Sequence, residues 1–268
     1  MKKSTIDASV NFDDLVRYVR RQDDYFTIYL SSQTGCAQRC KMCFLTQTGQ
    51  IKAEDLTGGQ ILSQAEKALA YYKTQPQAKR VNFAFMARGE PLTNPNVNDS
   101  LLRQLQGLAE QEQLFPRVLV STIMSKDEDL VSRFPVSQPE IYYSIYSLKP
   151  KFREKWLPRA LSPYGIKQHL QDYQESTKKF ITLHWAFIKN ENDDIRDVQY
   201  IVDWACGLRV NINIVRYNAF DDSSVEADES FIRSAVAYMK ARLPESKIQL
   251  KERVGEDVYA SCGMFENR

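Results

Sequence analysis

Three cysteines fall within eight residues, Cys36, Cys40 and Cys43, in the spacing C-x3-C-x2-C. Zinc sites usually pair their cysteines as two separate C-x2-C units or combine them with histidine, and this sequence has one compact triplet without a second pair. Three thiolates on one short loop can bind three irons of a cubane [4Fe-4S] cluster and leave the fourth iron open. An open iron is what a cluster needs to bind a small molecule. We therefore favour a ligand-binding cluster over a structural zinc loop or three unrelated thiols.

The composition is that of a globular protein with one substantial core. The chain has 268 residues, of which 43% are hydrophobic and 26% charged, and its formal net charge is +2. Any nucleic-acid contact must therefore come from a local patch of charge. No apolar run approaches the roughly 20 residues that span a bilayer, and the first residues lack the apolar core of a secretory signal. Five clustered cysteines indicate a reducing compartment, so we expect a cytoplasmic protein.

Strand and helix patterns alternate along the chain after a short lead-in over residues 1–25, which is either helical or extended. Alternation of this kind predicts a parallel sheet with helical crossovers, because parallel neighbours need them. We treat residues 26–268 as one α/β domain that carries a tail with Cys262. The predicted strands are 27–31, 81–86, 117–122, 140–146, 180–188, 210–215 and 247–253, and the predicted helices are 58–73, 96–113, 127–133, 165–178, 193–206 and 228–243.

Polar residues stand where several of these strands end. A parallel sheet that curls into a barrel collects its active site at the carboxyl ends of the strands, and the cysteine loop follows the first strand. Gly89 and Glu90 end the second strand, where Glu90 is placed to accept a hydrogen bond from an ammonium group. For each single hydroxyl or amide, capping of the next helix is an equal alternative, but together they favour a ring of ligand contacts. The others are Ser121-Thr122, Ser144 to Ser147, and Tyr217-Asn218.

These motifs together resemble the RlmN/Cfr family of radical S-adenosylmethionine (SAM) methyltransferases, which methylate an adenine base of ribosomal RNA and, for RlmN, of some transfer RNAs. The resemblance covers roughly residues 27–264 in the family's order, from the cysteine loop to the tail around Cys262. It is to a compact form, since only the lead-in precedes the first strand and the family's N-terminal accessory domain has no counterpart there. The resemblance implies a partial (β/α)6 barrel of the TIM-like, radical SAM type.

The resemblance also implies cofactors and roles. The cysteine triplet would hold a [4Fe-4S] cluster, and Cys262 would be the catalytic cysteine that accepts a methyl group from one SAM before a second SAM supplies a 5′-deoxyadenosyl radical. A polar, glycine-flanked tail agrees with a special role for Cys262, because structural cysteines prefer apolar sites, whereas Cys206 is most simply a core or capping residue. The implied SAM contacts are Gly89, Glu90, Ser121, Ser144, Ile145, Tyr146 and Asn218.

Three hypotheses about function follow. The leading one is a radical SAM methyltransferase of an RNA adenine that works through a methyl-cysteine. The second is another radical SAM reaction on the same scaffold, because Tyr29 stands where the family has a second cysteine. The third is a non-catalytic, cluster-containing RNA-binding derivative. We expect a monomer that takes electrons from flavodoxin or ferredoxin and does not bind membranes. A basic segment, 149–159, which contains Phe152 and Trp156, either binds RNA or is a solvated face.

Overall fold

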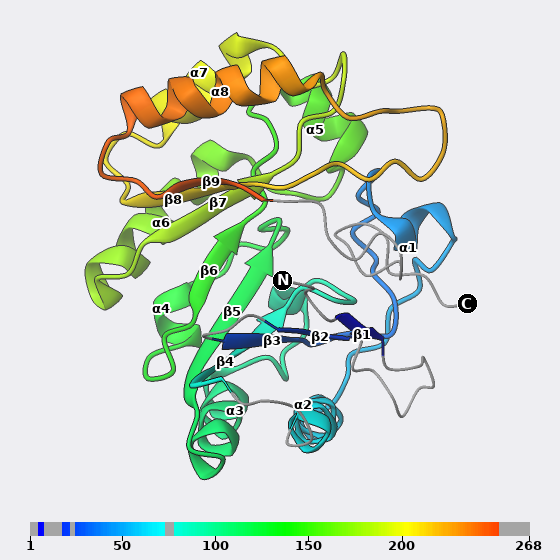
Figure 1. Ribbon diagram of the computed structural model, residues 1–268, viewed down its shortest axis with the longest axis vertical. Helices are drawn as coiled ribbons and strands as arrows, with labels where there is room; N and C mark the ends of the chain where they lie inside the picture. Colours follow the sequence, from blue (N-terminus) through cyan, green and yellow to red (C-terminus); the bar gives the residue numbers. More distant parts are fainter. Residues whose placement is uncertain (1–4, 8–17, 22–24, 73–77, 252–268) are drawn as a thin grey trace.

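Seven parallel strands form the centre of the molecule, and helices join each strand to the next (Figure 1). The computed structural model describes residues 5–7, 18–21, 25–72 and 78–251. The parallel strands are β3 (Tyr25–Tyr29), β4 (Arg80–Phe85), β5 (Phe115–Thr122), β6 (Glu140–Tyr143), β7 (Ile181–Trp185), β8 (Val210–Ile214) and β9 (Ile248–Leu250). Most of their residues are buried, as expected of a sheet covered by helices.

The crossovers contain the helices that the hydrophobic periodicity predicts, with three short additions, α1 (Phe44–Gln47), η1 (Pro91–Thr93) and α5 (Pro150–Trp156). None of the helices in the described part of the chain combines the length and the apolarity that a membrane span requires. The helical elements, in chain order, are α1 (Phe44–Gln47), α2 (Gly58–Tyr72), the 3-10 turn η1 (Pro91–Thr93), α3 (Asp99–Gln111), α4 (Leu130–Arg133), α5 (Pro150–Trp156), α6 (Pro163–Thr177), α7 (Ile195–Trp204) and α8 (Glu229–Arg242).

The order of the strands in the sheet is the order of the strands in the chain. Every crossover therefore steps to the next neighbour in one direction, and the right-handedness of such connections puts the helices on one face of the sheet. The sheet curls into a half-barrel with the helices outside (Figure 1). The predicted α/β fold, a partial TIM-like barrel, is confirmed, with seven parallel strands that agree with the six strand–helix units and the final strand expected from the sequence.

Three local features differ from the expectation or complete it. Two short strands, β1 (Thr5–Asp7) and β2 (Tyr18–Arg21), extend the sheet beyond β3 in antiparallel pairing, so the extended alternative for the lead-in is correct where it is described. Strand β6 ends three residues earlier than predicted, which leaves residues 144–147 in the loop above it. Helix α5 occupies part of the basic segment, where no helix was predicted; Pro150 opens it, as is common at a first helical position.

The loops after β3 and β4 are joined by hydrogen bonds at the edge where the site lies. The Ser32 amide donates to the Arg88 carbonyl at 2.8 Å, and the Glu90 amide donates to Gln33 Oε1 at 2.9 Å. The Asn94 side chain donates to the Ser32 carbonyl at 2.6 Å and to the Leu56 carbonyl at 2.9 Å, and it is completely buried. These contacts satisfy backbone groups that the ends of the strands leave unpaired.

Asn94→Ala should lower the free energy of unfolding by about 2 kcal/mol, because three buried hydrogen bonds, including one from the Asn96 amide at 2.8 Å, are lost together. Urea unfolding of the cluster-free protein measures the change. Gln104→Ala on the exposed face of α3 is the matched control, for which we expect less than about 0.5 kcal/mol. Equal effects for the two variants would contradict this account of the loop junction.

Candidate functional site

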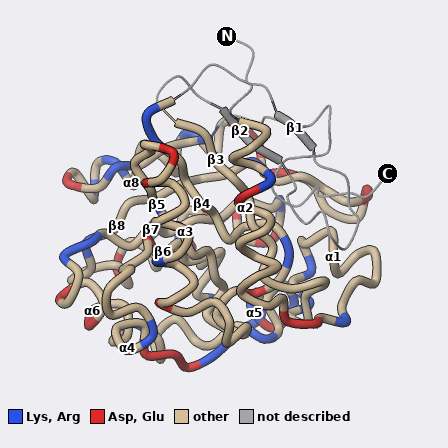
Figure 2. The backbone as a smooth tube through the Cα atoms, turned by 90° about the horizontal axis from the view of Figure 1, so that it is seen from below, with Lys and Arg blue, Asp and Glu red and all other residues tan. Residues whose placement is uncertain are grey.

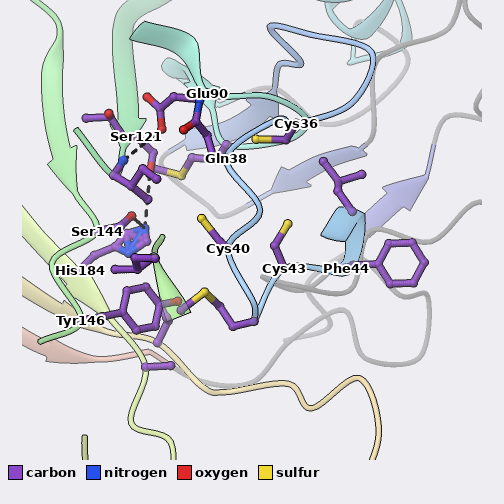
Figure 3. A pocket seen from close by; sticks show the side chains of 18 of the residues that line it. Cys36, Gln38, Cys40, Cys43, Phe44, Glu90, Ser121, Ser144, Tyr146 and His184 are labelled. Carbon is purple, nitrogen blue, oxygen red and sulfur yellow. Dashed lines mark hydrogen bonds between the residues drawn. The ribbon is translucent and has the colours of Figure 1, made fainter. Parts of the chain in front are cut away.

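A pocket lies over the carboxyl ends of the parallel strands (Figure 3). It encloses about 1160 Å³, including solvent at its mouth. Its walls come from the loops after β3, β4, β5, β6 and β8 and from the end of β7, so the expected convergence of strand ends is present. The predicted site residues that line it are Cys36, Cys40, Cys43, Gly89, Glu90, Ser121, Ser144, Tyr146 and Asn218.

One described residue of the predicted site, Ile145, is not part of this wall. The Ile145 side chain is completely buried in the hydrophobic core and does not line the pocket, although its neighbours Ser144 and Tyr146 do. Its carbonyl accepts a hydrogen bond from Arg153 Nη1 at 3.1 Å. Cys262 lies outside the described residues. Cys206 is exposed in the turn after α7, so it is not a core residue.

The cysteine loop is shaped by backbone hydrogen bonds to both sides of the pocket. The Cys36 amide donates to the Gln50 carbonyl at 3.0 Å, and the Lys41 amide donates to the Trp156 carbonyl at 2.9 Å. The three thiols face the same pocket (Figure 3), yet among the described residues no three Cys, His, Asp or Glu side chains are close enough together to hold one metal ion.

Burial keeps the three thiols protonated unless a positively charged group binds them. Burial is the largest cause that raises the pKa of Cys36, to about 12, and it also raises the pKa of Cys40 and Cys43. Charge on Cys43 and Glu90 raises the pKa of Cys36 and Cys40 further. Thiols in this state are poor ligands until a metal displaces their protons, because metals bind the thiolate. The donor set therefore fits a cationic metal group and does not fit three free thiolates.

Gly35 precedes the loop at a place where a side chain has no room. A Cβ atom there would lie 2.1 Å from the Lys52 carbonyl oxygen and 2.6 Å from that of Gln50. Gly89, on the next loop, has a φ of +94°, and a Cβ atom there would lie 2.6 Å from Ser32 Oγ. Gly35 lets the two ends of the cysteine loop approach each other, and Gly89 lets the loop after β4 approach the start of the loop after β3.

Glu90 is a buried carboxyl that bridges two strand ends. Its Oε2 accepts from the Ile123 amide at 3.1 Å and its Oε1 from the Leu92 amide at 3.4 Å. Burial is the main cause that raises its pKa to about 7, and these hydrogen bonds oppose the increase. Arg133 fixes the segment that follows through the carbonyls of Leu92 and Asn94, at 2.8 and 2.7 Å. A carboxylate so placed is suited to a cationic ligand in the pocket.

His184, at the end of β7, lies between two of the predicted contacts (Figure 3). Its Nε2 is 3.4 Å from Ser121 Oγ and 3.4 Å from Ser144 Oγ, while its Nδ1 is buried without a hydrogen-bond partner among the described residues. A buried N–H without an acceptor is rarer than an unsatisfied acceptor, so we assign the proton to Nε2. In that tautomer the imidazole donates to both hydroxyl oxygens and leaves each hydroxyl proton free to donate to a ligand.

Burial, with a smaller contribution from Lys251, lowers the pKa of His184 to about 4. The imidazole is therefore neutral at physiological pH. The sequence has only two histidines, His169 and His184, and no motif around His184 marks it. His184 stands two residues after Thr182, which is buried, so the alternation of the strand places both side chains on the same face. This alternation is the one signal that the sequence offers for His184.

The aromatic residues of the basic segment are not exposed for stacking on RNA bases. Phe152 and Trp156 are 4% and 1% exposed and belong to a second hydrophobic cluster beneath the pocket, where Cys40, Met42 and Tyr146 pack against it. Lys149 pairs with Asp197 at 2.8 Å, and Lys155 pairs with Glu191. Arg153 is buried and donates to backbone carbonyls, so three of the five basic side chains are engaged within the protein. Acidic and basic residues are interspersed along the described backbone (Figure 2).

Comparison with known proteins agrees with the motifs. No protein-family model matches the chain. The dual-specificity RNA methyltransferase RlmN of Sulfurimonas denitrificans is 24% identical over 254 residues, which is 92% of this chain and 69% of that protein. The protein of the same name from a Nitratiruptor species is 22% identical in an alignment of 281 positions, which covers 100% of this chain and 73% of that protein.

Solved structures agree on the fold. A radical SAM methyltransferase from Sphaerobacter thermophilus superposes with a TM-score of 0.76 at 20% identity, over 92% of this chain and 72% of that one. Spore photoproduct lyase complexed with dinucleoside spore photoproduct gives a TM-score of 0.62 at 12% identity, over 84% of this chain and 76% of that one. The resemblance to RlmN-like radical SAM proteins is confirmed in sequence and in fold.

Gly35→Ala should reduce the iron bound after anaerobic reconstitution by half or more, because the new Cβ atom meets two backbone carbonyls that shape the cysteine loop. Gly59→Ala in the first turn of α2 is the matched control, since a Cβ atom there has nothing within 4 Å and should leave iron binding unchanged. Iron and sulfide analysis, with circular dichroism to check folding, makes the comparison. Wild-type iron content in Gly35→Ala would show that the loop tolerates the displacement.

Wild-type protein should lose stability more steeply than His184→Asn as the pH falls from 6.5 to 4. Because the folded-state pKa of His184 is about 4 and its ordinary value is 6.5, the unfolded chain binds more protons in this window. The difference of 2.5 pH units corresponds to at most about 3 kcal/mol. Glu90 titrates in both proteins and cancels. Urea unfolding at several pH values tests this, and parallel stability curves would refute the assignment of a buried neutral imidazole.

Proposed function

We propose that this RlmN-like radical SAM protein is a methyltransferase that uses a [4Fe-4S] cluster and SAM to modify RNA. The observation that carries the proposal is the meeting of the three-cysteine loop with polar strand-end residues in one pocket. The relatives named RlmN are dual-specificity RNA methyltransferases, and the solved relative from Sphaerobacter thermophilus is a radical SAM methyltransferase, which supports the same reaction class.

Cys36, Cys40 and Cys43 would hold the cluster. Their shared exposure to one pocket and their need for a cationic partner fit such a group. When bound, the cluster supplies the electron that cleaves the sulfonium of SAM. The rest of the work falls to the protein, which must bind SAM, orient it and keep solvent from the reacting atoms.

For SAM we propose contacts from both sides of the pocket. Glu90 would accept from the SAM ammonium group, beside the close backbone approach that Gly89 allows. The hydroxyls of Ser121 and Ser144, held by His184, would donate to acceptors on SAM. Tyr146 and Asn218 would complete the ring from the loops after β6 and β8. Ile145 would contribute only through its backbone, because its side chain is in the core.

The finer parts of the proposal come from the resemblance. The substrate would be an adenine base of ribosomal or transfer RNA, and Cys262 would carry the methyl group as a methyl-cysteine before transfer. We also propose that the protein is a cytoplasmic monomer that takes electrons from a flavodoxin or ferredoxin. The three free cysteines of the loop support a reducing compartment.

A second candidate is a radical SAM reaction of another type, and Tyr29 is the residue that favours it. Tyr29 ends β3, directly before the cysteine loop, where the resembling family has its second working cysteine. A phenol is a weak replacement for a thiolate at neutral pH, because its ordinary pKa is about 10. If the family mechanism operates here, release of the product must use another thiol.

Wild-type protein, reconstituted anaerobically and supplied with SAM, reductant and total RNA, should form 5′-deoxyadenosine and a methylated adenine. Cys40→Ala should form neither, since one ligand of the cluster is gone. Cys262→Ala should still cleave SAM, slowly, without methylated RNA, since the cluster does not need that thiol. Nucleoside mass spectrometry, iron analysis and mass spectrometry of Cys262 give the readouts.

The outcomes separate the candidates. Wild-type protein that holds one zinc and no iron would end the radical SAM proposal. SAM cleavage with no methylated RNA, and with Cys262 unmethylated in the wild type, would favour the second candidate. Equal methylation of RNA by wild type and Cys262→Ala would retain the methyltransferase and remove the methyl-cysteine.

A further inference from the structure

Arg88 ties the loop after β4 to the two ends of the cysteine loop. Its Nη1 donates to the Thr34 carbonyl at 2.6 Å, and its Nη2 donates to Gln50 Oε1. The backbone carbonyl of the same Gln50 accepts from the Cys36 amide at 3.0 Å. A guanidinium is therefore held rigidly against the segment that carries the three cysteines, and it lines the same pocket.

Among the described residues, no carboxylate neutralises the charge of this guanidinium. Both hydrogen-bond acceptors of Arg88 are uncharged, and no ion pair to it occurs among the residues that the structure describes. Arg88 is 7% exposed, and its Nε is buried without an acceptor in the described part of the chain. A buried cation of this kind is costly unless something negative lies beside it.

The three cysteines that share this pocket become negative when a metal binds them as thiolates. Arg88 hydrogen-bonds to Thr34, two residues before Cys36, so its guanidinium is held beside the loop that carries them. Glu90, on the other side of Gly89, lines the same pocket with its carboxyl group. The loop after β4 therefore brings one fixed cation and one carboxyl group to the cysteine loop.

We propose that Arg88 is a fixed counter-charge for the group bound by Cys36, Cys40 and Cys43, and that it raises the reduction potential of that group. Reduction adds one electron to a cluster that three thiolates already make anionic. A cation buried nearby stabilises the reduced form more than the oxidised form, because net charge and local dipoles set cluster potentials. This inference rests on the proposed function, since it requires an iron–sulfur cluster at the three cysteines.

The test is a redox titration of the reconstituted protein without SAM, with dithionite as reductant and electron paramagnetic resonance as readout. Arg88→Met should retain wild-type iron and shift the midpoint potential negative by about 59 mV or more, a tenfold loss in the equilibrium constant for one-electron reduction. Arg88→Lys keeps the charge and loses the two-pronged hydrogen bonding, so it should stay near the wild-type potential.

Arg39→Met is the matched control, because it removes the same charge from an exposed position on the cysteine loop. Its shift should be less than half that of Arg88→Met, since solvent screens an exposed charge. A fully loaded Arg88→Met with the wild-type potential overturns the inference and leaves the proposed function intact. Wild-type protein without any cluster removes both.

If Arg88→Met fails to load iron, the lysine variant decides. Arg88→Lys that loads a cluster at the wild-type potential supports the role of the charge. Arg88→Lys that is also empty, or that loads a cluster whose potential falls as far as 59 mV or more, overturns it, because the hydrogen bonds to Thr34 and Gln50 would then be what matters.

Discussion

Compensation of charge inside one pocket is the constraint on which the site depends. Three thiols and the carboxyl of Glu90 share a buried space, and burial raises the pKa of each of them. Acidic groups crowded in this way cannot all ionise unless positive charge joins them. Two backbone amides donate hydrogen bonds to Glu90, and the Arg88 guanidinium is held against the cysteine loop by its hydrogen bond to Thr34. The remaining positive charge must come from what the pocket binds.

The parallel sheet makes this crowding possible at low structural cost. Consecutive strands end at the same rim, so one short loop from each supplies a side chain to the pocket without long excursions of the chain. Buried polar side chains, among them Asn94 and Gln33, form hydrogen bonds with the backbone groups that are left unpaired at the strand ends. The positions of the site residues are therefore fixed by the hydrogen bonds that surround them.

The sequence predicts the fold and most of the pocket wall, because hydrophobic periodicity reports strands and helices, and topology then brings strand ends together. The prediction fails where the role of a residue depends on the direction of its side chain or on a partner that is distant in the sequence. Ser144 and Tyr146 line the pocket while Ile145 between them enters the core, an outcome set by the conformation of the loop after β6. Phe152 and Trp156 look like a stacking surface in sequence, but α5 turns them inward. The hydrogen bonds of His184 to Ser121 and Ser144, and of Arg88 to Thr34, join residues that are 40 to 63 positions apart in the sequence. No local sequence pattern contains such pairs.

The bond between the Lys41 amide and the Trp156 carbonyl bears on how the protein is assembled. It fastens the cysteine loop, which follows the third strand, to a helix that lies more than 100 residues further along the chain. During synthesis the loop emerges long before this partner and cannot take its final shape until α5 has packed under the pocket. Contacts of such long sequence separation form late in folding, because closing the chain between them costs entropy. The final shape of the cysteine loop therefore depends on formation of the half-barrel as far as α5.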